Sequence, residues 1–396
     1  MSHAGNGRTA PPSLCEETPT ATPTAPPSTA PSSAASGSAR RDAGRGKPRD
    51  PFLDNAKYLT ILLVGLGHAW APMVSDSDTA GALYLATYTF HMPAFIVISG
   101  YLSRGFAGRP AQVRRLVTGV AVPYVVFEIA FTLFMRVIEN PDRAFSMFTP
   151  SYALWFLVAL FVWRLTTPVW KALRWPLPVA LVIAMVASAT PGIGGAMDLM
   201  RVLQFLPFFV LGLQLRPEHF ELLRHRAMRV AAVPVLAASL VFGYWALPRM
   251  NSTWLLRHDA APEMGVPAWV GPVMTLATFG CALAMTAALL ALTPRRTTWF
   301  TSLGAGTVFA YLLHVYPIHL ARQYDWYSLP GADSTLGRAV FTVLALAMMT
   351  ALCTQPVRRV FRCVVEPRME WAFRCLDATD SGRSEQAPAV RRLAAR

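Results

Sequence analysis

Charged residues are scarce in this chain. Asp, Glu, Lys and Arg make up 15% of its 396 residues, whereas a soluble domain usually carries about 25%. Hydrophobic residues make up 54% and gather in long apolar runs. This balance excludes an ordinary soluble protein and predicts an all-α polytopic membrane protein.

Cysteine is also rare, with five residues scattered along the chain and no CxxC pair. An odd, scattered set of this kind argues against a disulfide framework and against a zinc site. We therefore expect no metal ion and no permanently bound cofactor.

Several functional motifs are missing. There is no P-loop and no glycine fingerprint between a strand and a helix, so nothing indicates a nucleotide-hydrolysing motor. There is no GxSxG turn and no convincing internal repeat, which weakens a transporter built from symmetric halves. The net charge of +14 is spread over loops and tails, so it indicates membrane topology and no binding of nucleic acid.

The two ends of the chain differ from its middle. Residues 1–50 are rich in Pro, Ser and Ala and contain almost no large apolar side chains, so we expect a disordered tail. The basic end of that tail, ARRDAGRGKPRD, predicts a cytoplasmic N-terminus. Residues 357–396 are expected to form a second, basic cytoplasmic tail.

Residues 51–356 are predicted to form a membrane domain of about ten transmembrane helices. Arginine and lysine are more frequent in alternate loops, which predicts that the N- and C-termini both lie in the cytoplasm. We expect the chain to cross the plasma membrane. The apolar segments lie near 57–74, 81–103, 117–138, 151–170, 176–191, 199–215, 229–247, 268–292, 299–320 and 335–355.

A histidine lies deep in the first segment. Lys57 opens the apolar run, and His68 follows about 16 Å further along a helix, near the middle of the hydrocarbon core. An ionisable group at that depth is costly, which makes it a candidate functional group. A neutral imidazole could take a proton from a hydroxyl group as a general base. The alternative is a structural histidine hydrogen-bonded within the helices.

Other polar side chains lie in later segments. His91 is a second acid–base candidate or a group that orients the molecule carrying that hydroxyl, with core packing as the alternative. Glu128 could pair with an arginine or with His68. Arg201 and His314 lie toward the predicted outer ends of their segments, where they could hold or guide a hydroxyl-bearing substrate. Snorkelling of Arg201 and a structural hydrogen bond of His314 are the alternatives.

Several segments resemble the integral membrane acyltransferase 3 superfamily. In DNAKYLTILLVGLGHAW, the residues Asp54, Lys57 and His68 follow the family's order of acidic residue, basic residue and histidine. FHMPAFIVISGYLSRG and RRLVTGVAVPY resemble its second-helix signature and its basic loop, and later landmarks extend to about residue 355. The lysine and the TFHMPAF stretch are most similar to the fucose 4-O-acetylase-like branch.

The resemblance implies O-acylation. The donor would be acyl-coenzyme A, expected to be acetyl-coenzyme A, and the acceptor a hydroxyl of a sugar, a glycan or a related compound. His68 matches the histidine regarded as catalytic in the family, and Lys57 matches the basic residue of the same motif. Arg104, Arg114 and Arg115 match a basic loop tied to activity.

The charge pattern agrees with this expectation. Coenzyme A is polyanionic, and Lys57 and the three loop arginines are predicted to face the cytoplasm, where the donor is available. Arginine suits bidentate contacts to phosphate, although membrane topology alone is the alternative. Attack on a thioester creates an oxyanion that needs hydrogen-bond donors, and Ser99, Tyr101 and Trp155 are candidates.

A transporter or exporter of a glycan or small metabolite is the competing interpretation. Its histidines would relay protons or line a permeation path. The two classes differ in their product, because one forms a new ester and the other moves an unchanged solute across the bilayer. The ordered family motifs and the lack of visible repeats favour the membrane O-acyltransferase.

Overall fold

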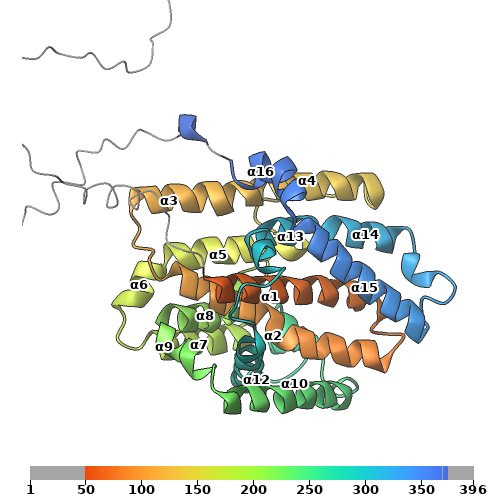
Figure 1. The fold of residues 1–396 in the computed structure, drawn as a ribbon, viewed down its shortest axis with the longest axis horizontal. Helices are drawn as coiled ribbons and strands as arrows, with labels where there is room; N and C mark the ends of the chain where they lie inside the picture. The colour runs from red at the N-terminus through yellow and green to blue at the C-terminus, as the bar shows by residue number, and fades with distance from the viewer. Residues whose placement is uncertain (1–49, 368, 373–396) are drawn as a thin grey trace, which may run out of the picture. The chain divides into compact units, whose positions relative to one another are not determined.

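The computed structural model describes residues 50–367 and 369–372, and every regular element among them is a helix (Figure 1). The predicted all-α class is therefore confirmed for this part of the chain. The predicted N-terminal tail, apart from Asp50, and residues 373–396 lie outside the described residues.

The first two helices begin at well-formed caps. α1 (Pro51–Trp70) starts with Asp50 as N-cap, whose side chain accepts a hydrogen bond from the Phe52 amide at 2.9 Å. Pro51 at the first helical position has its backbone angle already set for a helix. α1 therefore begins six residues before the apolar run at 57. α2 (Asp78–Ser103) is capped in the same way by Ser77.

The remaining elements follow in chain order, and three of them form one continuous helix from 110 to 138: α3 (Pro110–Leu116), the π-helical turn η2 (Val117–Ala121) and α4 (Val122–Ile138). The other helices are α5 (Trp155–Leu165), α6 (Thr167–Ala172), α7 (Pro176–Ala189), α8 (Leu199–Gln214), α9 (Pro217–Leu222), α10 (Arg226–Ala246), α11 (Thr253–Leu256), α12 (Val270–Leu292), α13 (Thr307–Leu313), α14 (Val315–Gln323), α15 (Thr335–Leu352) and α16 (Gln355–Val365). Short 3-10 turns are η1 (Ala71–Met73), η3 (Tyr152–Leu154), η4 (Pro262–Met264), η5 (Thr301–Ala305), η6 (Trp326–Ser328) and η7 (Glu370–Ala372).

Five of the described helices are long and apolar enough to cross a membrane: α2, the continuous helix 110–138, α10, α12 and α15. Each of the other predicted segments also contains helix, but these helices are shorter or more polar. Ten membrane spans and cytoplasmic termini therefore stay predictions. The predicted domain boundary at 356 falls inside α16.

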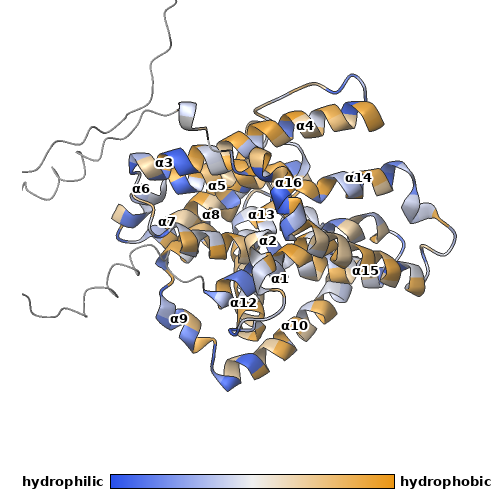
Figure 2. Ribbon diagram, turned by 45° about the horizontal axis from the view of Figure 1, so that its top comes forward, coloured by the Kyte–Doolittle hydropathy of each residue, from blue (hydrophilic) through white to orange (hydrophobic). Residues whose placement is uncertain are grey.

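α1 and α2 lie in the middle of the helices in Figure 1, with the helix 110–138 along one edge and α10 along the opposite edge. In the most apolar stretch of α2, 72% is buried, against 11% for α10 and for α15. α4, α10 and α15 show mostly hydrophobic colours in Figure 2. Peripheral helices that expose apolar residues are what a lipid environment requires.

Glycines set two close helix contacts. A Cβ at Gly100 of α2 or Gly212 of α8 would collide with the backbone of the opposite helix. A Cβ at Gly304 would likewise collide with the backbone of Asp54 at the start of α1, while the His314 ring centroid lies 5.3 Å from that of His68. α1 and the segment 304–314 therefore run side by side in the same direction.

Candidate active site

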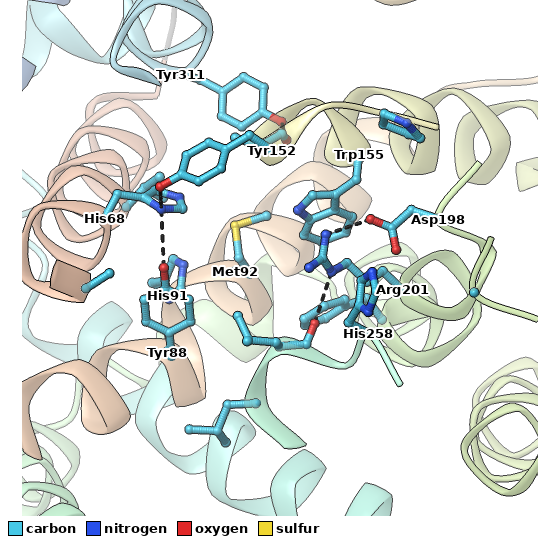
Figure 3. Close-up of a pocket in the computed structure, with 18 of the residues that line it drawn as sticks. His68, Tyr88, His91, Met92, Tyr152, Trp155, Asp198, Arg201, His258 and Tyr311 are labelled. Atoms are coloured by element: carbon cyan, nitrogen blue, oxygen red, sulfur yellow. Dashed lines mark hydrogen bonds and ion pairs between the residues drawn. The ribbon is translucent and has the colours of Figure 1, made fainter. Parts of the chain in front are cut away.

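A cavity of about 410 Å³ lies beside the second half of α1 (Figure 3). It is lined by Val64 and His68 of α1, which lie four residues apart on one helix face, and by Ala71 of the turn η1 that follows. Exposed lining residues lie in the loops before η3, before α8 and after α11: Thr149, Gly195 and His258; we call this side of the cavity its mouth. The polar and aromatic residues that line it include His68, Tyr84, Tyr88, His91, Tyr152, Trp155, Asp198, Arg201, His258, Tyr311 and Arg322.

His68 presents its imidazole to the cavity, held by two phenols. The Oη of Tyr152 lies 2.8 Å from His68 Nδ1, and the Oη of Tyr88 lies 3.3 Å from the same atom. No side chain or carbonyl in the described part of the chain bonds Nε2. When Nδ1 donates its proton to a phenol oxygen, Nε2 is the basic nitrogen available to a substrate.

Two further imidazoles lie near His68 with fixed tautomers. His91 Nδ1 donates to the Thr87 carbonyl at 2.8 Å, and His314 Nδ1 donates to the Tyr311 carbonyl at 2.7 Å. A carbonyl only accepts, so in the neutral form of each ring Nδ1 carries the proton and Nε2 does not. His91 lines the cavity, whereas His314 is fully buried and its Nε2 has no partner among the described residues. Within those residues, no group of three or more His, Cys, Asp or Glu is placed to hold a metal ion.

Tyr152 reaches His68 from an anchored turn. Its backbone has φ +49°, a left-handed conformation that is costly for a residue with a side chain. The preceding Ser151 donates from its amide and its hydroxyl to Glu128, at 2.8 and 2.5 Å. Glu128 is only 1% exposed. The sequence position of Glu128 suggested a pairing with an arginine or with His68, but the described residues show neither contact. Glu128 instead holds the turn that positions Tyr152.

Arg201 lies near the mouth in a polar network. Its guanidinium is 2.6 Å from Asp198 and donates to the Leu256 carbonyl at 3.2 Å. Its Cζ lies 5.4 Å from the ring centroid of Trp155. The second oxygen of Asp198, Oδ1, is buried without a partner in the described residues. This group, with exposed Arg322 nearby, offers charged and hydrogen-bonding atoms to a polar molecule at the mouth.

The basic residues predicted to bind the donor do not line this cavity: Lys57, Arg104, Arg114 and Arg115. Lys57 shares a helix face with His68, but fully buried Ile61 lies between them, and its Nζ is 2.6 Å from Asp54. Arg104 lies over the Tyr101 ring, with 3.7 Å from Cζ to the centroid, and donates to a carbonyl at 2.8 Å. The structure therefore brings together the predicted histidines but leaves the predicted cations outside their cavity.

Local sequence patterns do not mark the four tyrosines of the site: Tyr84, Tyr88, Tyr152 and Tyr311. Tyr88 lies three residues before His91 on the same helix, a spacing that could have placed both on one face. Tyr311 donates to the Ala153 carbonyl from a helix distant in sequence, and no local pattern signals that contact. Of the candidate oxyanion donors Ser99, Tyr101 and Trp155, only Trp155 lines the cavity.

Comparison with protein families gives one match. The family model described as an acyltransferase domain, Acyl_transf_3, matches residues 50–354. The match runs from the N-cap of α1 beyond the end of α15 and includes every residue of the cavity. Comparisons with curated proteins and with solved structures find no match.

Proposed function

The chain belongs to the acyltransferase 3 family, a family of membrane acyltransferases, and from this we propose which group it transfers and how. The donor is acyl-coenzyme A, with acetyl as the expected acyl group. The acceptor is a hydroxyl of a sugar, a glycan or a related compound. The observation that carries the proposal is the His68 imidazole, which two phenols hold at the cavity wall with Nε2 unbonded by any described residue.

His68 acts as the general base in this proposal. Its Nε2 takes the proton of the acceptor hydroxyl, and the acceptor oxygen forms a bond to the thioester carbonyl carbon. The C–S bond then breaks, and the leaving sulfur takes the proton from the imidazolium to give free coenzyme A. The phenol oxygen of Tyr152 accepts the Nδ1 hydrogen throughout and keeps the ring aimed at the reacting atoms.

Trp155 is the proposed donor to the oxyanion. It lines the same cavity, and no described residue accepts a hydrogen bond from its indole N–H. A donor already oriented before the reaction stabilises developing charge most strongly in a site that excludes water.

The mouth of the cavity supports a polar acceptor. Arg201, Asp198 and Arg322 supply charged groups, and Leu255 and Leu256 line the same cavity with apolar surface. Sugars present hydroxyls at their edges and C–H groups on their faces, which fits this mixture. The loops at the mouth are those predicted to face outward, so the proposed acceptor approaches from outside and the donor from the cytoplasm.

The test is an acyl-transfer assay on the purified full chain in nanodiscs. Acetyl-coenzyme A and candidate glycan acceptors are mixed with the protein, and both released thiol and new ester are measured. We expect His68→Ala to lower kcat by about 100-fold or more, the usual contribution of a general base. His225→Ala is the matched control, because His225 is exposed at the start of α10 and lies outside the cavity.

Two outcomes contradict the proposal. If folded His68→Ala protein keeps full acyl transfer, His68 is not the general base. If the wild-type protein moves a glycan across a vesicle membrane unchanged and releases no thiol from acyl-coenzyme A, the transporter interpretation replaces the enzyme.

A further inference from the structure

A second cavity, of about 340 Å³, lies beside α16, which begins after the matched family range ends at 354. Its wall holds three arginines of this helix. Its lining residues are Phe309, Gln355, Arg358, Arg359, Arg362 and Glu366. Figure 2 shows hydrophilic residues on α16 beside the hydrophobic α4.

The charges of this cavity are not balanced. Glu366 is its one carboxylate, and it lies 3.8 Å from Arg362. Arg358 and Arg359 have no carboxylate partner in the described residues, and the Nε of Arg358 is buried without any hydrogen-bond acceptor there. A buried donor without an acceptor is costly, and an anion in the cavity would remove that cost. Phosphate suits several guanidinium groups because they bind it through paired N–H donors.

The position of the α16 cavity relative to the His68 cavity indicates which kind of phosphate compound could bind there. Phe309 of α13 lines the α16 cavity, and Tyr311, two residues further, lines the His68 cavity. Phe309 precedes His314 by five residues, about 7.5 Å of helix rise, and the His314 ring lies 5.3 Å from the His68 ring. One helix therefore borders both cavities. A ligand with phosphates at α16 and a reactive group at His68 needs an extended arm between the two.

We propose that Arg358, Arg359 and Arg362 of α16 bind the phosphate groups of the acyl-coenzyme A donor. The inference rests on the proposed function. Coenzyme A carries its phosphates at one end and its thioester at the end of a long pantetheine arm, so one donor molecule has groups suited to each cavity. Free phosphate and a lipid headgroup share the phosphate chemistry but have no thioester to bring to His68.

The experiment measures donor kinetics of the full chain in nanodiscs. Arg358→Gln/Arg359→Gln is compared with Arg226→Gln, an exposed arginine at the start of α10 that lies outside both cavities. Loss of charge-assisted hydrogen bonds is expected to raise KM for acetyl-coenzyme A about tenfold or more while kcat is unchanged. Removing the donor's 3′-phosphate should weaken binding to the wild type and have a smaller effect on the double variant.

Each outcome separates this inference from the function on which it rests. A wild type that turns over no acyl-coenzyme A contradicts the proposed function itself. An active wild type whose KM the α16 variants leave unchanged contradicts only the phosphate site. Neutral phosphatidylcholine nanodiscs and nanodiscs with anionic phosphatidylglycerol separate the two sources of phosphate. A variant effect confined to anionic nanodiscs assigns the arginines to a lipid headgroup and overturns the proposal.

Arg359→Gln alone guards against misfolding. Arg359 is exposed, and no described residue hydrogen-bonds its guanidinium, so this variant is expected to unfold at the same temperature as the wild type. A rise in KM in this single variant, smaller than in the double variant, supports the site, and an unchanged KM contradicts the part assigned to Arg359.

Discussion

The two phenols at His68 Nδ1 decide how the imidazole faces a substrate. Tyr152→Phe keeps the ring and removes only the 2.8 Å hydrogen bond to His68. A hydrogen bond to a group that becomes charged contributes about 1.5–3 kcal/mol. We therefore expect kcat to fall at least about tenfold, with KM for acetyl-coenzyme A unchanged, in steady-state assays of thiol release.

Tyr124→Phe is the control for this variant. Its hydroxyl donates to the Met147 carbonyl at 2.7 Å and it does not line the cavity, so a hydrogen bond of similar length is lost elsewhere. If both variants lose activity equally, or if Tyr152→Phe changes KM alone, Tyr152 does not position the base.

Residues on one helix were easier to predict than residues that meet across loops. Its depth in an apolar run predicts His68 as a site residue, the next apolar run predicts His91, and both line the cavity. Tyr152 was missed because its place depends on a left-handed turn and on Glu128, which lies 24 residues earlier. Local sequence patterns contain no information about such a contact.

At the scale of elements, a close contact joins α2 and α8, which both contribute residues to the site. α2 carries His91 and α8 carries Arg201, while Gly100 and Gly212 let the two backbones touch. Small residues at such contacts are typical of packed membrane helices. Gly212→Ala inserts a methyl group against the α2 backbone, which cannot move aside as a flexible side chain could.

We expect Gly212→Ala to lower the free energy of unfolding by about 1–3 kcal/mol, as overpacking does. It should also reduce kcat/KM, because the two walls of the cavity separate. Thermal unfolding in nanodiscs and the acyl-transfer assay measure the two effects. Gly280→Ala is the control, since a Cβ there meets nothing within 4 Å. Equal stability of the two variants would show that the α2–α8 contact tolerates a side chain.

Helix positions followed from hydrophobicity, but several helix ends did not. Each predicted segment contains helix, because long apolar runs are the strongest signal in such a chain. The early start of α1 depends on Asp50 and Pro51, which are polar or helix-breaking in most contexts. The break between α13 and α14 falls at His314, three residues before Pro317, which has no amide to bond the Leu313 carbonyl; proline and not hydrophobicity marks it.

At the scale of the whole membrane domain, α13 borders two cavities, one through Phe309 and the other through Tyr311. The His68 cavity has its mouth among loops for which the arginine distribution predicts an outer location, and the α16 arginines belong to the predicted cytoplasmic side. If the proposed donor is acyl-coenzyme A, this arrangement matches the predicted orientation, because acyl-coenzyme A is available in the cytoplasm.

Orientation can be measured by the reactivity of single cysteines in intact cells. In a background with the native cysteines replaced by serine, Ser75→Cys lies in the exposed turn between α1 and α2, and Ala107→Cys in the exposed loop between α2 and α3. We expect a membrane-impermeant maleimide to label Ser75→Cys in intact cells and Ala107→Cys only after permeabilisation. α2 is long and apolar enough to separate the two positions by a whole membrane.

The reverse labelling pattern would place the mouth of the His68 cavity in the cytoplasm, so that acceptor and donor would have to approach from exchanged sides. Labelling of both positions in intact cells would contradict a membrane-spanning α2.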